Sequence, residues 1–136
     1  MDQPHLLHFN SHKDPRGQLV ALEAMREIPF DVKRVYYMSQ MERDTSRGFH
    51  AHRDLQQVAI CLAGSCTFII DDGKARKSFE LNSPDTGLFI GNHIWREMHN
   101  FSANCVLMVL ASAYYSDQDY IRDYSQFIEE VKSREK

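Results

Sequence analysis

Short segments of strand-like sequence, each closed by a turn signal, fill most of this chain, and this pattern constrains the fold more than any other feature. The hairpin signal Asp71-Asp72-Gly73 separates two such segments, and Lys13–Gly17 and Asn82–Asp85 mark further turns. About eight or nine short strands at regular spacing are typical of a β-barrel or a β-sandwich. We therefore expect an all-β domain with strands over about residues 5–112.

The expected strands follow the apolar and β-branched residues, and residues 91–104 are expected to connect the last two strands. The strands are predicted over residues 5–9, 18–23, 32–39, 47–52, 56–62, 66–70, 74–81, 86–90 and 105–111.

The tail of the chain changes to a helical period. Ser116 followed by Asp119 resembles a capping box. An apolar and aromatic stripe at helical spacing follows it, formed by Tyr120, Tyr124, Phe127, Ile128 and Val131. We expect a C-terminal α-helix over about residues 117–133, with its stripe packed on the barrel or on a second subunit rather than on a cofactor.

Composition narrows the class of protein. The 136 residues form a single expected domain (1–136), and the net charge of -3 without a basic stripe argues against nucleic-acid binding. The longest apolar run, over residues 105–111, is too short to span a membrane, and the first residues show no signal pattern. Cys61, Cys66 and Cys105 form no paired framework and are expected to act as small hydrophobes in a reducing compartment, which predicts a cytoplasmic protein.

The motif His50-Ala51-His52 places two imidazoles on the same face of an expected strand. It begins the metal-binding pattern of a cupin, a double-stranded β-helix or jelly-roll barrel, and Gly64 falls at the glycine of that pattern. The glutamate position holds Gln57, however, and the second-motif histidine position holds Arg96. A guanidinium has no lone pair to offer a metal, and an amide is a poor ligand for a transition metal. The sequence therefore predicts a cupin barrel without a bound metal, although Glu97 or His99 could still complete a ligand set.

Two imidazoles without a metal remain able to accept and return protons near neutral pH. One could act as the base at a carbon next to a ketone, while the other imidazole or Tyr37 relays protons between oxygens. Arg16, Arg34 and Arg47 are candidates for binding a diphosphate.

The expected strand over residues 32–39 carries two cations and two aromatic side chains. Alternation places Lys33, Val35 and Tyr37 on one face, with Arg34 and Tyr36 on the other. This strand is either one wall of a site or an ordinary packed strand with solvent-facing cations.

Several motifs together resemble the sugar-nucleotide 3,4-ketoisomerases, which are WxcM-like cupins acting on dTDP-4-keto-6-deoxyglucose. The motifs are Arg16-Gly17, Lys33–Tyr37, Arg47–His52, Asp71–Gly73, Trp95 with Glu97–His99, Met108–Tyr115 and Asp119–Arg122. The resemblance implies conversion of the 4-keto sugar to a 3-keto-6-deoxyhexose of gluco or galacto configuration. The product would supply an aminotransferase that makes a 3-amino-3,6-dideoxy sugar for a surface polysaccharide, such as the O-antigen of lipopolysaccharide, or for a glycoprotein.

The resemblance also implies a barrel without metal or cofactor and a homodimer that exchanges its amino-terminal strands. Carried over by position, His50 and His52 are the acid/base pair and Tyr37 assists them. The other positions that it implicates bind the substrate, namely Arg16, Arg34, Arg47, Tyr36, Gln57, Trp95 and His99. One position departs from the pattern, because family members can carry histidine where this chain has Arg96.

Two other functions are compatible with the same residues. A 3,5-epimerase acting on the same keto sugar also needs a histidine base in a metal-free barrel. A non-catalytic cupin would bind the nucleotide sugar without exchanging its protons.

Overall fold

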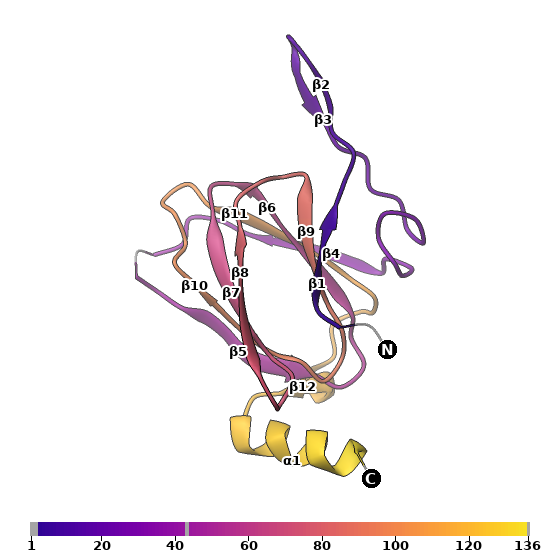
Figure 1. The fold of residues 1–136 in the computed structure, drawn as a ribbon, viewed down its shortest axis with the longest axis vertical. Helices are drawn as coiled ribbons and strands as arrows, with labels where there is room; N and C mark the ends of the chain where they lie inside the picture. The colour runs from indigo at the N-terminus through magenta and orange to yellow at the C-terminus, as the bar shows by residue number, and fades with distance from the viewer. Residues whose placement is uncertain (1–2, 43, 136) are drawn as a thin grey trace.

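The computed structural model describes residues 3–42 and 44–135, and its centre is a barrel of two five-stranded antiparallel sheets (Figure 1). The first sheet has the order β1-β9-β6-β11-β4, with bounds His5–His8, Thr86–Ile90, Gln57–Ala63, Val106–Ala111 and Arg34–Met38. The second has the order β12-β5-β10-β7-β8, with bounds Tyr120–Ile121, Arg47–His52, Trp95–His99, Cys66–Asp71 and Arg76–Leu81. The predicted all-β cupin fold with a terminal helix is confirmed.

Strand β6 shows why the barrel forms. It is buried on both faces, so its sequence reads as a nearly continuous apolar run. Ala59 and Cys61 join the apolar cluster that fills the barrel, while Val58 and Ile60 join a second cluster on the outer face of the first sheet. Gln57, at the start of β6, is polar and nevertheless buried, and it shares the inward face of Ala59.

Strand β10 lies within the segment predicted to be a connection, so that prediction is wrong. It pairs with β7 on one side and β5 on the other, and it therefore occupies the middle of the second sheet. Arg96 is 2% exposed on its inward face, and Trp95 is 4% exposed on its outward face. Because both faces are covered and one buried residue is charged, the strand lacks the polar and apolar alternation that predicts a half-buried strand.

The tail forms three short elements rather than one helix from residue 117. A 3-10 turn covers Asp117–Asp119, β12 follows it, and helix α1 covers Tyr124–Arg134. Ser116 makes no side-chain cap, whereas the Asp123 side chain accepts a hydrogen bond from the Gln126 backbone N–H. The predicted capping box was therefore wrong, and Asp119 has another partner, described below.

Helix α1 packs on the outer face of the second sheet. Phe127, which is fully buried, contacts a cluster that contains Ala51 and Trp95, and Val131 packs beside it. The helix lies in the described part of the chain, where no helix is long and apolar enough to cross a membrane.

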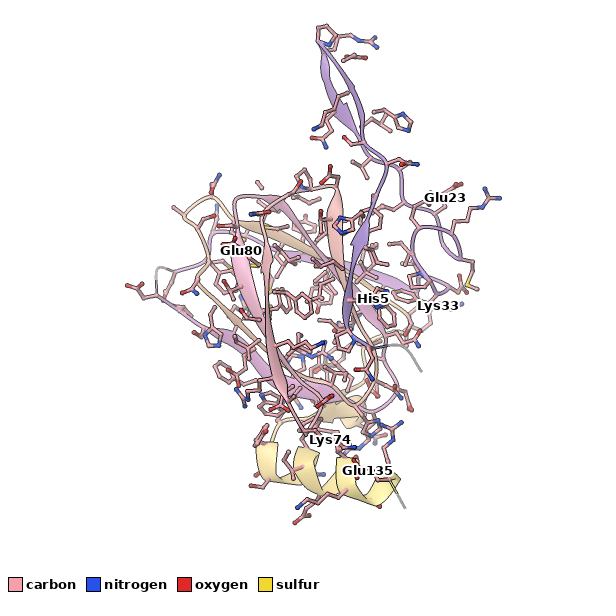
Figure 2. The ribbon with its side chains drawn as sticks, viewed as in Figure 1. His5, Glu23, Lys33, Lys74, Glu80 and Glu135 are labelled. Carbon is pink, nitrogen blue, oxygen red and sulfur yellow. The ribbon has the colours of Figure 1, made fainter. Side chains whose placement is uncertain are left out.

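The β7–β8 hairpin holds the end of this helix. Lys74 in the hairpin forms an ion pair with Glu135 at 3.0 Å, and Figure 2 shows the two side chains together at the end of the helix. Gly73 has a φ of +95°, and a Cβ added there would lie 2.9 Å from Cγ1 of Val131. Only glycine therefore allows this turn to lie against the helix without strain.

The amino-terminal region leaves the barrel. Strands β2 (His12–Asp14) and β3 (Gly17–Leu19) form a hairpin that projects away from the body of the molecule (Figure 1). This hairpin replaces the single strand predicted over residues 18–23. All six of its strand residues are exposed, so nothing in the described chain covers it.

Candidate active site

A bulge in β5 aims the histidine pair into the barrel. Gly48 and Phe49 both have positive φ angles, +93° and +55°, and the pairing of β5 with β10 shifts register beside them. Phe49 is the extra residue of this bulge, a feature that often re-aims side chains next to active sites. His50 and His52 follow with ring centroids 4.9 Å apart and ring planes at 86°. The prediction that the two imidazoles share one face is confirmed.

The buried His52 has a fixed tautomer. Its Nδ1 lies 2.9 Å from Oδ2 of Asp119, and Oδ1 of the same carboxylate accepts a hydrogen bond from the Asp54 backbone N–H at 2.7 Å. Because a carboxylate only accepts, Nδ1 of His52 carries the proton and Nε2 carries the lone pair. Nε2 is buried and has no hydrogen-bond partner among the described residues. This lone pair is available to take a proton from a ligand.

His50 is held in a similar way. Its Nδ1 lies 3.1 Å from the Gly48 carbonyl oxygen, which also can only accept, so the lone pair again falls on Nε2. The ring of Tyr120 packs against both imidazoles, with centroid distances of 5.1 Å to His50 and 4.4 Å to His52. Strand β12, which pairs with β5, positions this tyrosine.

A polar chain lies beneath the pair in the barrel interior. Arg96 donates from Nη1 to Oε1 of Gln57 and from Nη2 to the Ile94 carbonyl at 3.1 Å. Gln57 in turn donates from Nε2 to the hydroxyl of Tyr36 at 3.0 Å. A small cavity lined by Tyr36, His50, Gln57 and Arg96 joins this chain to His50. The structure therefore brings three of the predicted site residues together at this cavity, along with Arg96.

Burial and charge keep both imidazoles neutral. Desolvation, followed by the positive charge of Arg96, lowers the pKa of His50 to about 4 and that of His52 to about 2. Burial also lowers the pKa of Arg96 to about 10, so this side chain remains a cation at neutral pH. The site thus combines two neutral bases with the buried positive charge of Arg96.

This donor set does not fit the divalent metal of many cupin barrels. Two of the four ligand positions hold Gln57 and Arg96, and the guanidinium donates its hydrogens toward the space where a metal would need electron pairs. The three-ligand grouping that the described residues do contain is formed by cysteines elsewhere in the barrel. We therefore derive no catalytic step through a metal.

The predicted arginines fall in three places. Arg34 stacks on the rings of Tyr36 and Tyr115, at 5.2 and 5.6 Å, and its charge helps to lower the pKa of His52. Arg47 lines a cavity of about 250 Å³ near Phe101, outside the polar chain. Arg16 is exposed at the tip of the β2–β3 hairpin, where it pairs with Asp14 at 2.6 Å. Only Arg34 approaches the histidines within this chain.

Three other predicted residues point away from the pair. Tyr37 is 71% exposed and pairs in register with Met108, which packs on the outer cluster of the first sheet. Trp95 packs against Phe127 under helix α1, and His99 contacts Glu97 and Ser46 outside the barrel. Trp95 and His99 do not lie beside the histidines of this chain, because alternation along β10 places them on the face opposite Arg96. Their part in substrate binding stays a prediction. Tyr37 likewise does not contact the histidines of its own chain.

Two residues of the site were missed from the sequence. Asp119 and Tyr120 lie in the segment expected to be helical, where they were assigned to a cap and to a packing stripe. Arg53 holds this segment in place by donating from Nη1 to the backbone carbonyls of Gln118 and Tyr120, at 2.7 and 3.1 Å. Glu130 of helix α1 accepts from the same guanidinium at 2.8 and 3.2 Å. The tail thereby fixes the carboxylate that orients His52.

The fold and this interior define a cupin barrel built for proton transfer by side chains. Residues 2–132 match the family model described as "FdtA: WxcM-like, C-terminal". The chain therefore belongs to this family of sugar-nucleotide 3,4-ketoisomerases, which are isomerases.

Relatives of known structure or activity agree with this assignment. The chain is 50% identical over 122 residues to a TDP-4-oxo-6-deoxy-alpha-D-glucose-3,4-oxoisomerase from Aneurinibacillus thermoaerophilus, covering 90% of this chain and 88% of that protein. A 3,4-ketoisomerase from Helicobacter canadensis is 48% identical, with a TM-score of 0.92 and coverage of 95% of this chain and 97% of that one. A sugar 3,4-ketoisomerase from Thermoanaerobacterium thermosaccharolyticum, solved with TDP, is 46% identical, with a TM-score of 0.94 and coverage of 96% of both chains.

Proposed function

We propose that this protein converts dTDP-4-keto-6-deoxyglucose to a dTDP-linked 3-keto-6-deoxyhexose of gluco or galacto configuration. The observation that carries the proposal is the pair of neutral imidazoles, each with its lone pair on Nε2. The names of the relatives support the substrate. One 45% identical enzyme, with a histidine replaced by asparagine, was solved in complex with TDP-4-keto-6-deoxyglucose.

The reaction needs four proton movements and no change in the number of atoms or electrons. A base removes the proton from C3 of the sugar, and the C4 oxygen gains a proton, which gives an enediol. The C3 hydroxyl then loses its proton while C4 gains one, which leaves the ketone at C3. His50 and His52 supply the two bases, because their unprotonated Nε2 atoms can accept a proton and return it.

Fixed charge favours the intermediate. An enediolate carries negative charge on the sugar oxygens, and the permanent cation of Arg96 lies in the barrel below the histidines. The buried Nε of Arg34 has no partner within residues 3–42 and 44–135, so this guanidinium has a hydrogen bond to donate to a ligand such as a diphosphate. The anionic diphosphate would also raise the pKa of both histidines toward the range useful for a base.

Isotope exchange tests this function directly. Incubation of the purified protein with dTDP-4-keto-6-deoxyglucose in deuterated water is expected to give a 3-keto product with deuterium at C4, identified by NMR. Inversion at C5 with the ketone still at C4 would instead identify a 3,5-epimerase. Saturable binding of the nucleotide sugar without exchange would identify a non-catalytic protein, and either result would overturn the proposal.

We also propose that the protein acts as a homodimer that exchanges its amino-terminal segments. The exposed β2–β3 hairpin carries Arg16 away from its own barrel. An apolar groove of about 240 Å³ lies beside its base, lined by Val20, Ile60, Leu62 and Met108 among others. Leu62 is 42% exposed in one chain, so a second copy would cover apolar surface here. In such a dimer Arg16 can reach the site of the partner.

Mixing two inactive variants tests the exchange. Arg16→Ala and His52→Asn each damage one contribution to a shared site. If the hairpin serves the partner, subunit mixing regenerates some intact sites, and activity should return to about a quarter of the wild-type value per chain. If each site is built from one chain, mixing restores no activity. A monomer in light scattering would also exclude the exchange.

The cellular setting follows from the same substrate. We propose a cytoplasmic enzyme, supported by three unpaired buried cysteines and a nucleotide-linked substrate. The 3-keto product has the carbonyl group that an aminotransferase requires, which supports a place before the formation of a 3-amino-3,6-dideoxy sugar for a surface polysaccharide such as the O-antigen, or for a glycoprotein.

A further inference from the structure

Three thiols that the proposed reaction does not use meet inside the barrel. Cys61 lies near the end of β6, Cys66 begins β7, and Cys105 immediately precedes β11. Their sulfur atoms all lie within 4.8 Å of one another, and Sγ of Cys61 lies 3.5 Å from Sγ of Cys105. All three residues are at most 1% exposed. The expectation that they act as small hydrophobes is therefore incomplete, because they also form one cluster.

The cluster is separate from the histidine site. Gln57 and Cys61 both face the interior from β6, and four residues of extended chain separate them by roughly 13 Å. The histidines lie at the Gln57 end of this strand. A ligand at the thiols would therefore leave the sugar site free.

We propose that Cys61, Cys66 and Cys105 form a binding site for a thiophilic ion that prefers three sulfur ligands. Metal–thiolate bonds are about 2.3 Å long, so three thiolates around one ion in a plane lie about 4 Å apart. The observed separations need to change only slightly to reach this arrangement. Thiolates select soft ions over hard ones.

The surroundings favour three ligands over four. No histidine or carboxylate of the described residues joins the three sulfurs. Apolar side chains such as Leu107 surround them in the cluster that fills the barrel. Zinc in structural sites is almost always four-coordinate, so this site should prefer Cu(I) or trivalent arsenic to Zn(II).

The net charge of the loaded site determines which of these two ions is preferred. Cu(I) bound by deprotonated thiols leaves a net negative charge in an apolar interior, which is unfavourable. Arsenite reacts as As(OH)3 + 3 RSH → As(SR)3 + 3 H2O, so three As–S bonds replace three As–O bonds without oxidation or reduction. This product is neutral. We therefore expect trivalent arsenic to be the preferred ligand at neutral pH.

Two loops next to Cys66 and Cys105 in the chain are joined by a pair of hydrogen bonds. Ser102 donates its backbone N–H to the Ser65 carbonyl at 2.9 Å, and its hydroxyl accepts from the Ser65 N–H at 2.9 Å. Gly64, beside Ser65, has a φ of +70°, and a Cβ there would lie 2.2 Å from the Ser102 hydroxyl. Because Cys66 follows Ser65 and Cys105 lies three residues after Ser102, we expect separation of these two loops to open a path to the thiols at the end of the barrel away from the histidines. Ser102→Ala, which removes the hydrogen bond from the Ser65 N–H to the Ser102 hydroxyl, should therefore speed binding without changing its stoichiometry.

The site can be tested by titrating the reduced full-length protein with three ions. These are arsenite, Zn(II), and Cu(I) in competition with a chromophoric chelator. We expect one arsenic per chain in native mass spectrometry and a rise in the melting temperature. Each of Cys61→Ala, Cys66→Ala and Cys105→Ala should weaken binding at least about a hundredfold, since loss of even an outer-shell partner costs 10–100-fold. No binding, tightest binding of Zn(II), or full affinity in any single variant would overturn the proposal.

X-ray absorption on the loaded wild-type protein keeps the test valid if a variant fails to fold. The proposal requires three sulfur neighbours around the bound ion. Two sulfurs, or a mixture with oxygen or nitrogen, would overturn it. One Cu(I) with three sulfurs but no arsenic bound would support the three-thiol site and overturn the preference based on net charge.

Discussion

Asp119→Asn should damage the enzyme through the tautomer of His52. Both oxygens of Asp119 accept hydrogen bonds, one from His52 and one from the Asp54 backbone N–H. An amide must place its NH2 group against one of these donors. The backbone donor cannot change, so the imidazole must move its proton to Nε2. That atom then donates and can no longer accept a proton from the sugar.

The expected loss is large. Removal of a general base typically costs about 10²–10⁴ in rate, and the wrong histidine tautomer alone can cost about 10⁴. A turnover decrease of this size corresponds to about 2.7–5.5 kcal/mol in the activation barrier. His52→Asn, which removes the base itself, sets the reference. NMR product formation and deuterium incorporation measure both variants, while binding of dTDP should change little.

A second substitution distinguishes the tautomer from simple loss of charge. Asp119→Ala removes the carboxylate without adding a donor, so His52 can still present an unprotonated Nε2 part of the time. We expect Asp119→Ala to retain more activity than Asp119→Asn. Asp117→Asn, in the same turn but exposed, is the matched control and should be close to wild type. Equal losses in the two Asp119 variants, or Asp119→Asn within about threefold of wild type, would refute the reasoning.

Three further outcomes follow from the structure. Glu130→Gln or Arg53→Ala should lower kcat roughly ten- to hundredfold with little change in KM, because both residues position the Asp119 segment. Steady-state kinetics measures both constants, and an unchanged kcat would contradict the positioning role. The free energy of unfolding, measured in urea, should fall between pH 7 and 5 by about 2 kcal/mol for each histidine of the pair. The folded pKa values of these histidines lie below the unfolded value, so the unfolded chain binds more protons as the pH falls. A free energy of unfolding that does not change with pH would contradict this. Gly73→Ala should destabilise the protein by about 1–3 kcal/mol, because position 73 has a positive φ and a Cβ there would contact the helix. Gly17→Ala should destabilise it less, because a Cβ at position 17 meets nothing within 4 Å. Equal melting temperatures of the two variants would contradict this prediction.

Much of the fold could be predicted because its strands carry their own signals. Strands β6 to β9 match their expected positions within about two residues, a usual uncertainty for element ends. The histidine pair and Gln57 could be placed by the spacing of one motif, and Arg96 by the spacing of a second. These residues depend on local pattern, which a sequence records directly.

The errors arose where tertiary contacts override local pattern. The spacing of Asp119 from Ser116 predicts a helix cap, but its carboxylate instead binds a histidine 67 positions earlier in the chain. Strand β10, whose outer face carries Trp95 and His99, was not predicted at all. Arg16 lies on a hairpin whose strand residues are all exposed, although a single strand was predicted there. None of these relationships can be obtained from spacing along one segment.

The guanidinium of Arg96 gives the barrel a positive centre that belongs to the polypeptide. A chelator cannot remove this charge, and it does not vary with the supply of any ion. The same charge lowers the pKa of both imidazoles, so position 96 adjusts two bases at once. A substitution there cannot alter the basicity of one histidine while leaving the other unchanged. Any change in the catalytic pH range that starts from this position must therefore shift the two proton-transfer steps together.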